Sequence, residues 1–131
     1  MLVFVGSTPV HWSSKRQGCI ATSTYVAEFV ALRQATEEAI ALRYSLRCLG
    51  IPVTKPTNIF ADNFGVIQSA NIPHSDLNKK HVAISYHYVR EAVTAKIINP
   101  IWVRTDENFA DICTKALGRI TFESHVHLLM P

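Results

Sequence analysis

The sequence predicts an α/β fold with a mixed sheet, because short apolar runs typical of strands alternate with longer segments of helical periodicity. Two apolar runs come first, then a long helical segment, another strand, two helical segments, a last strand and two C-terminal helical segments. The runs are only a few residues long, whereas the helical segments repeat their apolar residues every three or four positions. A length of 131 residues suits a single domain over residues 1–131.

The N-terminal part of the chain is predicted to be a hairpin followed by a long helix. Apolar runs at residues 2–5 and 10–14 flank the turn-forming residues 6–9, which favours a β-hairpin. Ser23 or Thr24 can cap the helix that follows, and Gly50 marks its end. Because the apolar residues of this helix fill more than one stripe, we expect other elements to cover it.

The remaining elements follow from local patterns. The segments predicted are a strand buried on both faces at 58–62, helices at 64–70 and 79–95, a strand at 101–103, a helix at 108–117 and a short helix near 122–129. We expect Trp12 and Trp102 to be core aromatics because both lie on predicted strands. His125 and His127 lack further metal ligands nearby in the sequence, so we expect them at the surface.

Composition excludes several classes of protein. Hydrophobic residues make up 48% of the chain and charged residues 18%, which excludes a disordered tail. No apolar run approaches the ~20 residues that span a bilayer, so we expect no membrane association and an intracellular location. The net charge of +3 permits a polyanionic partner without requiring one. Three scattered cysteines indicate reduced thiols that act as small core residues, rather than a disulfide framework or a zinc site.

Three acidic residues lie in otherwise apolar sequence, namely Glu28, Asp62 and Asp111. Asp62 ends a predicted strand, where open α/β sheets bind their ligands. Because buried carboxylates are costly unless they are paired or bound to metal, a shared metal site is one interpretation. Plainer roles remain open: Asp111 can stabilise a helix N-terminus, Asp62 can cap the next helix, and Glu28 can be solvated.

Five blocks of the sequence together resemble the ribonuclease H domain at the end of Ty1/copia-type retrotransposon polyproteins. The blocks are PVHWSSKRQ at 9–17, STYVAEFVAL at 23–32, IFADN at 59–63, KHVAISYHYVRE at 80–91 and ADICTKAL at 110–117. They occur in the family's order with near-family spacing and cover almost the whole chain. The resemblance implies a ribonuclease H-like mixed sheet with flanking helices.

The resemblance also implies a reaction, which is hydrolysis of the RNA strand of an RNA–DNA hybrid with two Mg²⁺ ions. Glu28, Asp62 and Asp111 match three of the family's four catalytic, metal-binding carboxylates. Mg²⁺ prefers oxygen ligands, and two ions about 4 Å apart can orient water and stabilise the leaving oxygen. Two carboxylates about 4 Å apart repel by roughly 4 kcal/mol at an effective dielectric constant of 20, so such a cluster needs cations.

Four further residues are candidate contacts to nucleic acid. Thr24 and Asn63 lie beside two of the acids, and Lys80 and His81 begin a modest basic cluster. Cationic side chains contact phosphates in sequence-independent binding. Thr24 and Asn63 are equally well explained as helix caps, and the basic residues as a solvated helix face.

The sequence also departs from the family. The fourth carboxylate stands on the family's first, central strand, whereas Met1 lies where the second strand begins and no acid precedes Glu28. We therefore expect that strand to be missing and metal binding to be weakened. The gap would be closed by direct pairing of the flanking strands, or by a strand from another protein chain or a second copy. Polar family residues are also replaced by Val26, Ala83 and Ser85.

These departures leave three functional hypotheses. The first is a ribonuclease H-type enzyme of retrotransposon origin, acting in the cytoplasm, a virus-like particle or the nucleus. The second is a non-catalytic structural or interaction module that reuses the fold in a larger assembly. The third is an enzyme restored by a partner chain that supplies the missing strand and its Asp.

Overall fold

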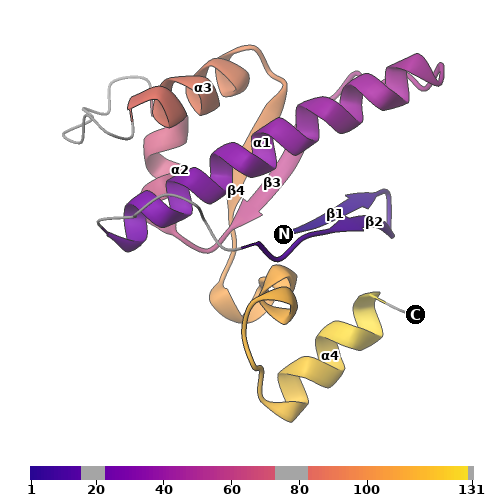
Figure 1. Cartoon of the computed structure of the whole chain (residues 1–131), viewed down its shortest axis with the longest axis vertical. Coiled ribbons are helices and arrows are strands. Elements are labelled where there is room, and N and C mark those ends of the chain that lie inside the picture. Colours follow the sequence, from indigo (N-terminus) through magenta and orange to yellow (C-terminus); the bar gives the residue numbers. More distant parts are fainter. Residues whose placement is uncertain (16–22, 73–82, 130–131) are drawn as a thin grey trace. The chain divides into compact units, whose positions relative to one another are not determined.

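The computed structural model describes residues 1–15, 23–72 and 83–129. In chain order, its elements are β1 (Leu2–Val5), β2 (Thr8–Trp12), α1 (Thr24–Cys48), β3 (Thr57–Ala61), α2 (Phe64–Asn71), α3 (Ala83–Thr94), β4 (Ile98–Trp102), two 3₁₀ helices (Thr105–Glu107 and Phe109–Cys113) and α4 (Arg119–Leu129) (Figure 1). The predicted α/β class is confirmed.

The chain divides into two compact units, each of which is described by itself. The central unit is Cys19–Val103, and the terminal unit combines Met1–Gly18 with Arg104–Pro131. The central unit contains α1, α2, α3, β3 and β4, and the terminal unit contains β1, β2, the 3₁₀ helices and α4. The assignment of residues 1–131 to a single domain stays a prediction.

The described strands form two separate two-stranded sheets, where the sequence predicted one mixed sheet. β1 and β2 pair antiparallel, from Leu2 opposite Trp12 to Val5 opposite Thr8. β3 and β4 pair parallel, and Ala61 lies opposite Trp102. An antiparallel pair needs only a short turn, whereas a parallel pair needs a long crossover, here the segment that holds α2 and α3. Both strand directions of a mixed sheet therefore occur, but in different sheets.

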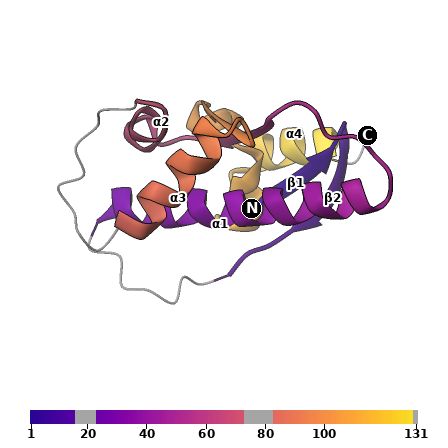
Figure 2. The same cartoon turned by 90° about the horizontal axis from the view of Figure 1, so that it is seen from above.

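The apolar core of the central unit forms where its three helices meet the sheet. Phe29 of α1 and Val89 of α3 are fully buried, and Ile98 of β4 belongs to the same cluster. The rings of Tyr25, Phe29 and Tyr86 follow one another at centroid distances of 5.8 and 5.7 Å. α3 lies alongside α1 in both views (Figures 1 and 2). The buried residues of α1 lie on one stripe between Val26 and Ala39, whereas Tyr44 in the last turns is 71% exposed. The expectation that the long helix is largely covered is therefore met on one face only.

Only one face of the β3–β4 sheet is covered within this unit. Ile59 and Ile98 contact the helical core, whereas Asn58 and Asn99 are exposed and hydrogen-bonded to each other at 3.1 Å. Phe60 shares the face of Asn58, because side chains alternate along a strand, and it is 57% exposed. The prediction that residues 58–62 are buried on both faces is therefore wrong. The sequence pattern did not show one buried and one exposed face, because the aromatic Phe60 occupies the exposed face.

The ends of α1 match the sequence prediction closely. Ser23 caps the helix, since its Oγ accepts a hydrogen bond from the Val26 N–H at 3.3 Å. Gly50 adopts φ of 76° just beyond the last turn, a conformation that favours glycine. Arg43 then ties the chain back to the helix, because its guanidinium donates to the Lys55 carbonyl at 2.7 Å and to Thr57 Oγ1 at 3.1 Å.

The terminal unit confirms the predicted hairpin but differs in detail from the sequence analysis. Gly6 provides the turn with φ of 63°, while Pro9 lies in β2 rather than in the turn. Trp12 is 70% exposed, so its assignment to a core is wrong. The helix predicted at 108–117 is instead a 3₁₀ helix, Phe109–Cys113. Asn108 caps that helix, since its Oδ1 accepts from the Ala110 N–H at 3.3 Å.

Buried polar groups are the second departure in this unit. His125 of α4 is only 3% exposed, which contradicts its predicted surface position. Its ring packs edge-to-face on Phe109 at 5.1 Å, and its Nε2 lies 3.2 Å from the Asp106 carbonyl oxygen. His127 is exposed, as expected.

Cys48 and Cys113 are free thiols, and Cys19 lies outside the described residues. Cys48 is exposed and Cys113 is half-buried, so the expectation that the cysteines are small core residues is wrong for Cys48. Within the described ranges, every helix is either too short or too polar to cross a membrane.

Candidate functional site

Glu28 lies early in α1, on the side of the helix that approaches the core. It is half-buried, and the neighbouring Val26 and Phe29 are buried at 4% and 0% exposure. α1 packs against β3, the strand that ends one residue before Asp62. The central unit therefore holds two of the three predicted acids on packed elements. Its half-buried position distinguishes Glu28 from a fully solvated helix residue.

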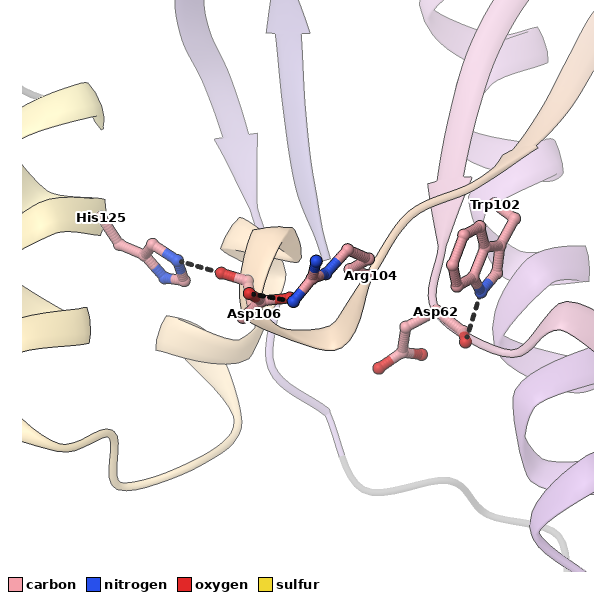
Figure 3. Close-up of polar contacts among 5 residues, drawn as sticks. All are labelled: Asp62, Trp102, Arg104, Asp106 and His125. Atoms are coloured by element: carbon pink, nitrogen blue, oxygen red, sulfur yellow. Dashed lines mark hydrogen bonds and ion pairs between the residues drawn. The ribbon is translucent and has the colours of Figure 1, made fainter.

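Asp62 directly follows β3 and is half-buried. Its backbone carbonyl accepts a hydrogen bond from the Trp102 indole Nε1 at 3.1 Å (Figure 3). The cap of α2 is the next residue, Asn63, whose Oδ1 accepts from the Val66 N–H at 3.2 Å. The interpretation of Asp62 as a helix cap is therefore wrong, and its carboxylate is left for another role.

Asp111 lies in the terminal unit and is the one acidic residue buried among those described, at 7% exposure. Its Oδ2 lies 3.0 Å from the Nζ of Lys115, one helical turn later. Its carbonyl also accepts from the Lys115 N–H at 2.9 Å, which holds the two residues together. A carboxylate with so little exposure needs a cation beside it, and here Lys115 supplies one.

A second polar cluster follows the central unit along the chain. Arg104 donates from Nε and Nη2 to the two carboxylate oxygens of Asp106, at 3.0 and 3.1 Å (Figure 3). The hydrogen bond with Asp106, and then the negative charges of Asp106 and Glu107, raise the pKa of the Arg104 guanidinium. The backbone carbonyl of Asp106 is the one that His125 contacts, so this cluster orients the segment against α4.

Mg²⁺ suits the chemistry of the three predicted ligands, since all are carboxylates with hard oxygen donors. Glu28 and Asp62 belong to the central unit and Asp111 to the terminal unit. Among the residues that the structure describes, no three His, Cys, Asp or Glu side chains form a group that could hold a metal ion. Only the type of donor therefore suits the ion, and the Asp111 carboxylate is paired with Lys115 in this structure.

The structure describes two of the four predicted nucleic-acid contacts, Thr24 and Asn63. Thr24 is exposed and is the first residue of α1, whereas the cap of that helix is Ser23. Asn63 is half-buried and has the capping role that the sequence left open. Lys80 and His81 lie outside the described residues.

Two features escaped the sequence analysis. Lys115 was not connected with Asp111, although a spacing of four residues is the usual signal for such a pair. The aromatic pair of Phe64 and Trp102 was also missed, because Trp102 was assigned to the core. No local pattern indicates that these two rings meet, since 38 positions separate them in the sequence.

The elements define a mixed α/β protein with two small sheets. Its homologues are retrovirus-related Pol polyproteins of plant transposons. The chain is 32% identical to that of transposon RE1 and 31% identical to that of RE2, both from Arabidopsis thaliana, over 123 residues or 94% of its length. It is 32% identical to that of TNT 1-94 from Nicotiana tabacum over 114 residues, or 87% of its length. The chain spans about 8% of the length of these curated relatives. No protein-family model and no solved structure matches it.

Proposed function

We propose that the chain is a ribonuclease H-like domain of a copia-type retrotransposon Pol polyprotein, which hydrolyses the RNA strand of RNA–DNA hybrids. The homology over 94% of the chain carries this proposal. The types of the three acids support it, since Glu28, Asp62 and Asp111 match three of the carboxylates that the resemblance implies. An intracellular location fits this origin.

In this proposal Glu28, Asp62 and Asp111 are the residues that would hold Mg²⁺. The bound ions would supply an oriented water and stabilise the leaving oxygen. The half-buried Glu28 and Asp62 keep the carboxylates partly shielded from water, which strengthens their attraction for cations. Asp111 would exchange Lys115 for metal, and the 54% exposure of the Lys115 side chain allows it to move into solvent. Thr24, Asn63, Lys80 and His81 remain proposed contacts to the hybrid.

The test is cleavage of an end-labelled RNA–DNA hybrid in Mg²⁺, with products separated by length. We expect Glu28→Gln and Asp62→Asn each to lower the rate by more than the roughly 10–100-fold typical of residues that merely support a metal ligand. Glu38→Gln is the matched control, since Glu38 is exposed on the same helix, and it should leave the rate unchanged. Equal rates for Glu28→Gln and Glu38→Gln would contradict the proposal.

We further propose that another protein chain, or a second copy, adds a strand beside β3. The Thr57 N–H and the Ala61 carbonyl both bond toward β4. In a parallel pair, the backbone N–H and C=O groups of alternate residues point away from the partner strand. Those of Asn58 and Phe60 therefore point to the edge of β3 opposite β4. Among the described residues, β4 is the one strand paired with β3. That edge can therefore accept a further strand.

Amide hydrogen exchange tests whether a partner strand pairs with β3. Sedimentation of the same sample gives its molecular mass and so shows whether the chain is monomeric. The amides of Asn58 and Phe60 should exchange rapidly in the monomer and become protected when the chain associates. The Ala61 amide on the β4 side is the internal control. Slow exchange at Asn58 and Phe60 in a proven monomer would show that no outside strand is needed.

A non-catalytic structural or interaction module is the second candidate function. The observation that favours it is the Asp111–Lys115 ion pair, which neutralises a predicted metal ligand without any metal. Direct titration with Mn²⁺, followed by its electron paramagnetic resonance signal, separates the two candidates. Saturable binding that Glu28→Gln abolishes supports the enzyme, and an unchanged free-Mn²⁺ signal supports the module.

A further inference from the structure

Two large aromatic side chains are exposed together at the carboxyl ends of β3 and β4. Trp102 is the last residue of β4 and is 46% exposed, and Phe64 is the first residue of α2 and is 60% exposed. Their rings meet edge-to-face, at a centroid distance of 6.1 Å and an interplanar angle of 90°. Both belong to the central unit. The carboxyl ends of parallel strands are where such sheets bind ligands.

The Trp102 ring is held by its own hydrogen bond, and the backbone on either side of the pair is fixed by further ones. The Trp102 indole N–H donates to the Asp62 carbonyl at 3.1 Å (Figure 3), and the next residue, Val103, donates its N–H to the Ala61 carbonyl at 3.0 Å. Phe64 follows Asn63, whose side chain is fixed as the cap of α2. Since the one polar group of the indole is already satisfied, what Trp102 offers a ligand is its ring face.

The surroundings make this pair too small and too polar for a protein interface. Asp62 and Asn63 border it. Phe60, the nearest exposed aromatic in the sequence, projects from the opposite face of the sheet, because Trp102 is in register with Ala61 and side chains alternate. Two rings fall far short of the roughly 800 Å² that each partner of a stable protein complex buries. A flat aromatic ligand about the size of one nucleobase fits such a site better.

We propose that Phe64 and Trp102 form a stacking site for an unpaired nucleobase of the bound nucleic acid. The proposal rests on the proposed function, since Asp62, which anchors the indole, is also the carboxylate proposed to act on the sugar–phosphate backbone. Stacking on aromatic rings tolerates any sequence, because every base has a π-face. The site would therefore hold a strand near Asp62 without selecting its sequence.

Tryptophan fluorescence tests the proposal directly. The chain has two tryptophans, so Trp12→Phe leaves Trp102 as the sole emitter. This variant is titrated in EDTA, where no cleavage occurs, with a single-stranded RNA dodecamer and with a hybrid that carries a single-stranded RNA overhang. We expect saturable quenching, and Phe64→Leu should weaken the affinity about tenfold. Tyr44→Leu is the matched control, since Tyr44 is an aromatic exposed on α1, and it should not change the affinity.

Two results would overturn the stacking site. One is binding, seen by fluorescence anisotropy of the labelled RNA, without quenching of Trp102. The other is equal quenching by an abasic oligonucleotide of the same length, which would show attraction to the phosphates alone. The proposed nuclease function fails separately: quenching without hybrid cleavage in Mg²⁺ would remove the enzyme and keep the base site.

Discussion

The two units of the chain bury different kinds of residue. In the central unit most buried residues form a continuous apolar cluster from α1, α2, α3 and β4, with Phe29 and Val89 fully enclosed. Two polar residues, Thr36 and Ser85, are buried there as well, and the Thr36 hydroxyl donates to the Leu32 carbonyl at 2.8 Å. In the described part of the terminal unit, the buried residues are Asp111 and His125, both polar. The hydrophobic effect does not depend on the relative orientation of the buried groups. A buried polar group, in contrast, stabilises the fold only when its hydrogen-bond or ion-pair partners are in place.

This contrast shows where each unit tolerates change. The central unit should lose stability in proportion to the apolar volume removed from its core. The terminal unit should respond to the loss of single partners, because each buried polar group has few of them. Local opening should therefore be easier in the terminal unit than in the central unit. Three substitutions test the comparison, in order of decreasing effect.

The largest effect is expected from Phe29→Ala in the central unit. The Phe29 ring is fully buried between Tyr25 and Tyr86, so truncation leaves a cavity and should cost about 3–5 kcal/mol of unfolding free energy. Urea denaturation followed by circular dichroism measures the loss. Tyr44→Ala is the control, because Tyr44 is 71% exposed on the same helix and should change stability by less than about 0.5 kcal/mol. Similar losses for both variants would disprove the core assignment.

Lys115→Met should have an intermediate effect, confined to the terminal unit. It removes the cation beside the buried Asp111 carboxylate, and about 1–2 kcal/mol of local stability should be lost because Lys115 itself is half exposed. Hydrogen exchange of peptides from residues 104–129 should accelerate, while those of α1 should not change.

Arg119→Met provides the matched comparison for Lys115→Met. Arg119 forms an ion pair of the same spacing with Glu123, but both side chains are exposed, at 88% and 61%. Exposed ion pairs contribute little to stability, so the opening free energy measured by hydrogen exchange should change by less than about 0.5 kcal/mol. Equal acceleration of exchange by Arg119→Met and Lys115→Met would contradict the prediction. It would mean that the burial of Asp111 does not make its ion pair more important than an exposed one.

Local sequence signals predicted the helices of the central unit well, whereas β4 spans Ile98–Trp102 rather than the predicted 101–103. Ser23 and Gly50 marked the ends of α1 through capping and left-handed backbone preferences, which depend on neighbouring residues alone. The strand at 58–62 was located but its open face was not, because Phe60 made the run look uniformly apolar. Exposure of that face depends on which elements pack there, and no local pattern records this.

The sequence selects the candidate acids but does not predict their environment. Apolar flanks identified Glu28, Asp62 and Asp111, and the structure places two of them half-buried and the third buried. The partners were not foreseen: Lys115 beside Asp111, and Trp102 on the Asp62 carbonyl. The Trp102 contact joins residues on two different strands, so it depends on the β3–β4 register, which the sequence alone does not fix.

Among the three test substitutions, the smallest effect is expected from His125→Phe. This variant tests whether the buried imidazole stabilises the terminal unit. His125 Nε2 contacts the Asp106 carbonyl at 3.2 Å, while its Nδ1 is buried without a hydrogen-bond partner in the structure. Phenylalanine keeps a ring against Phe109 and removes the unsatisfied nitrogen, and water can reach the exposed Asp106. The gain and the loss nearly cancel, so stability should change by less than about 1 kcal/mol.

His125→Ala separates ring packing from hydrogen bonding at the same position. It removes the ring as well, and should destabilise the terminal unit by about 2 kcal/mol, more than His125→Phe does. Hydrogen exchange over α4 measures both variants. Equal destabilisation by the two would mean that the imidazole nitrogens, rather than the ring, hold α4 in place. The terminal unit would then depend on polar partners at both of its buried positions, Asp111 and His125, and the contrast with the apolar core of the central unit would be complete.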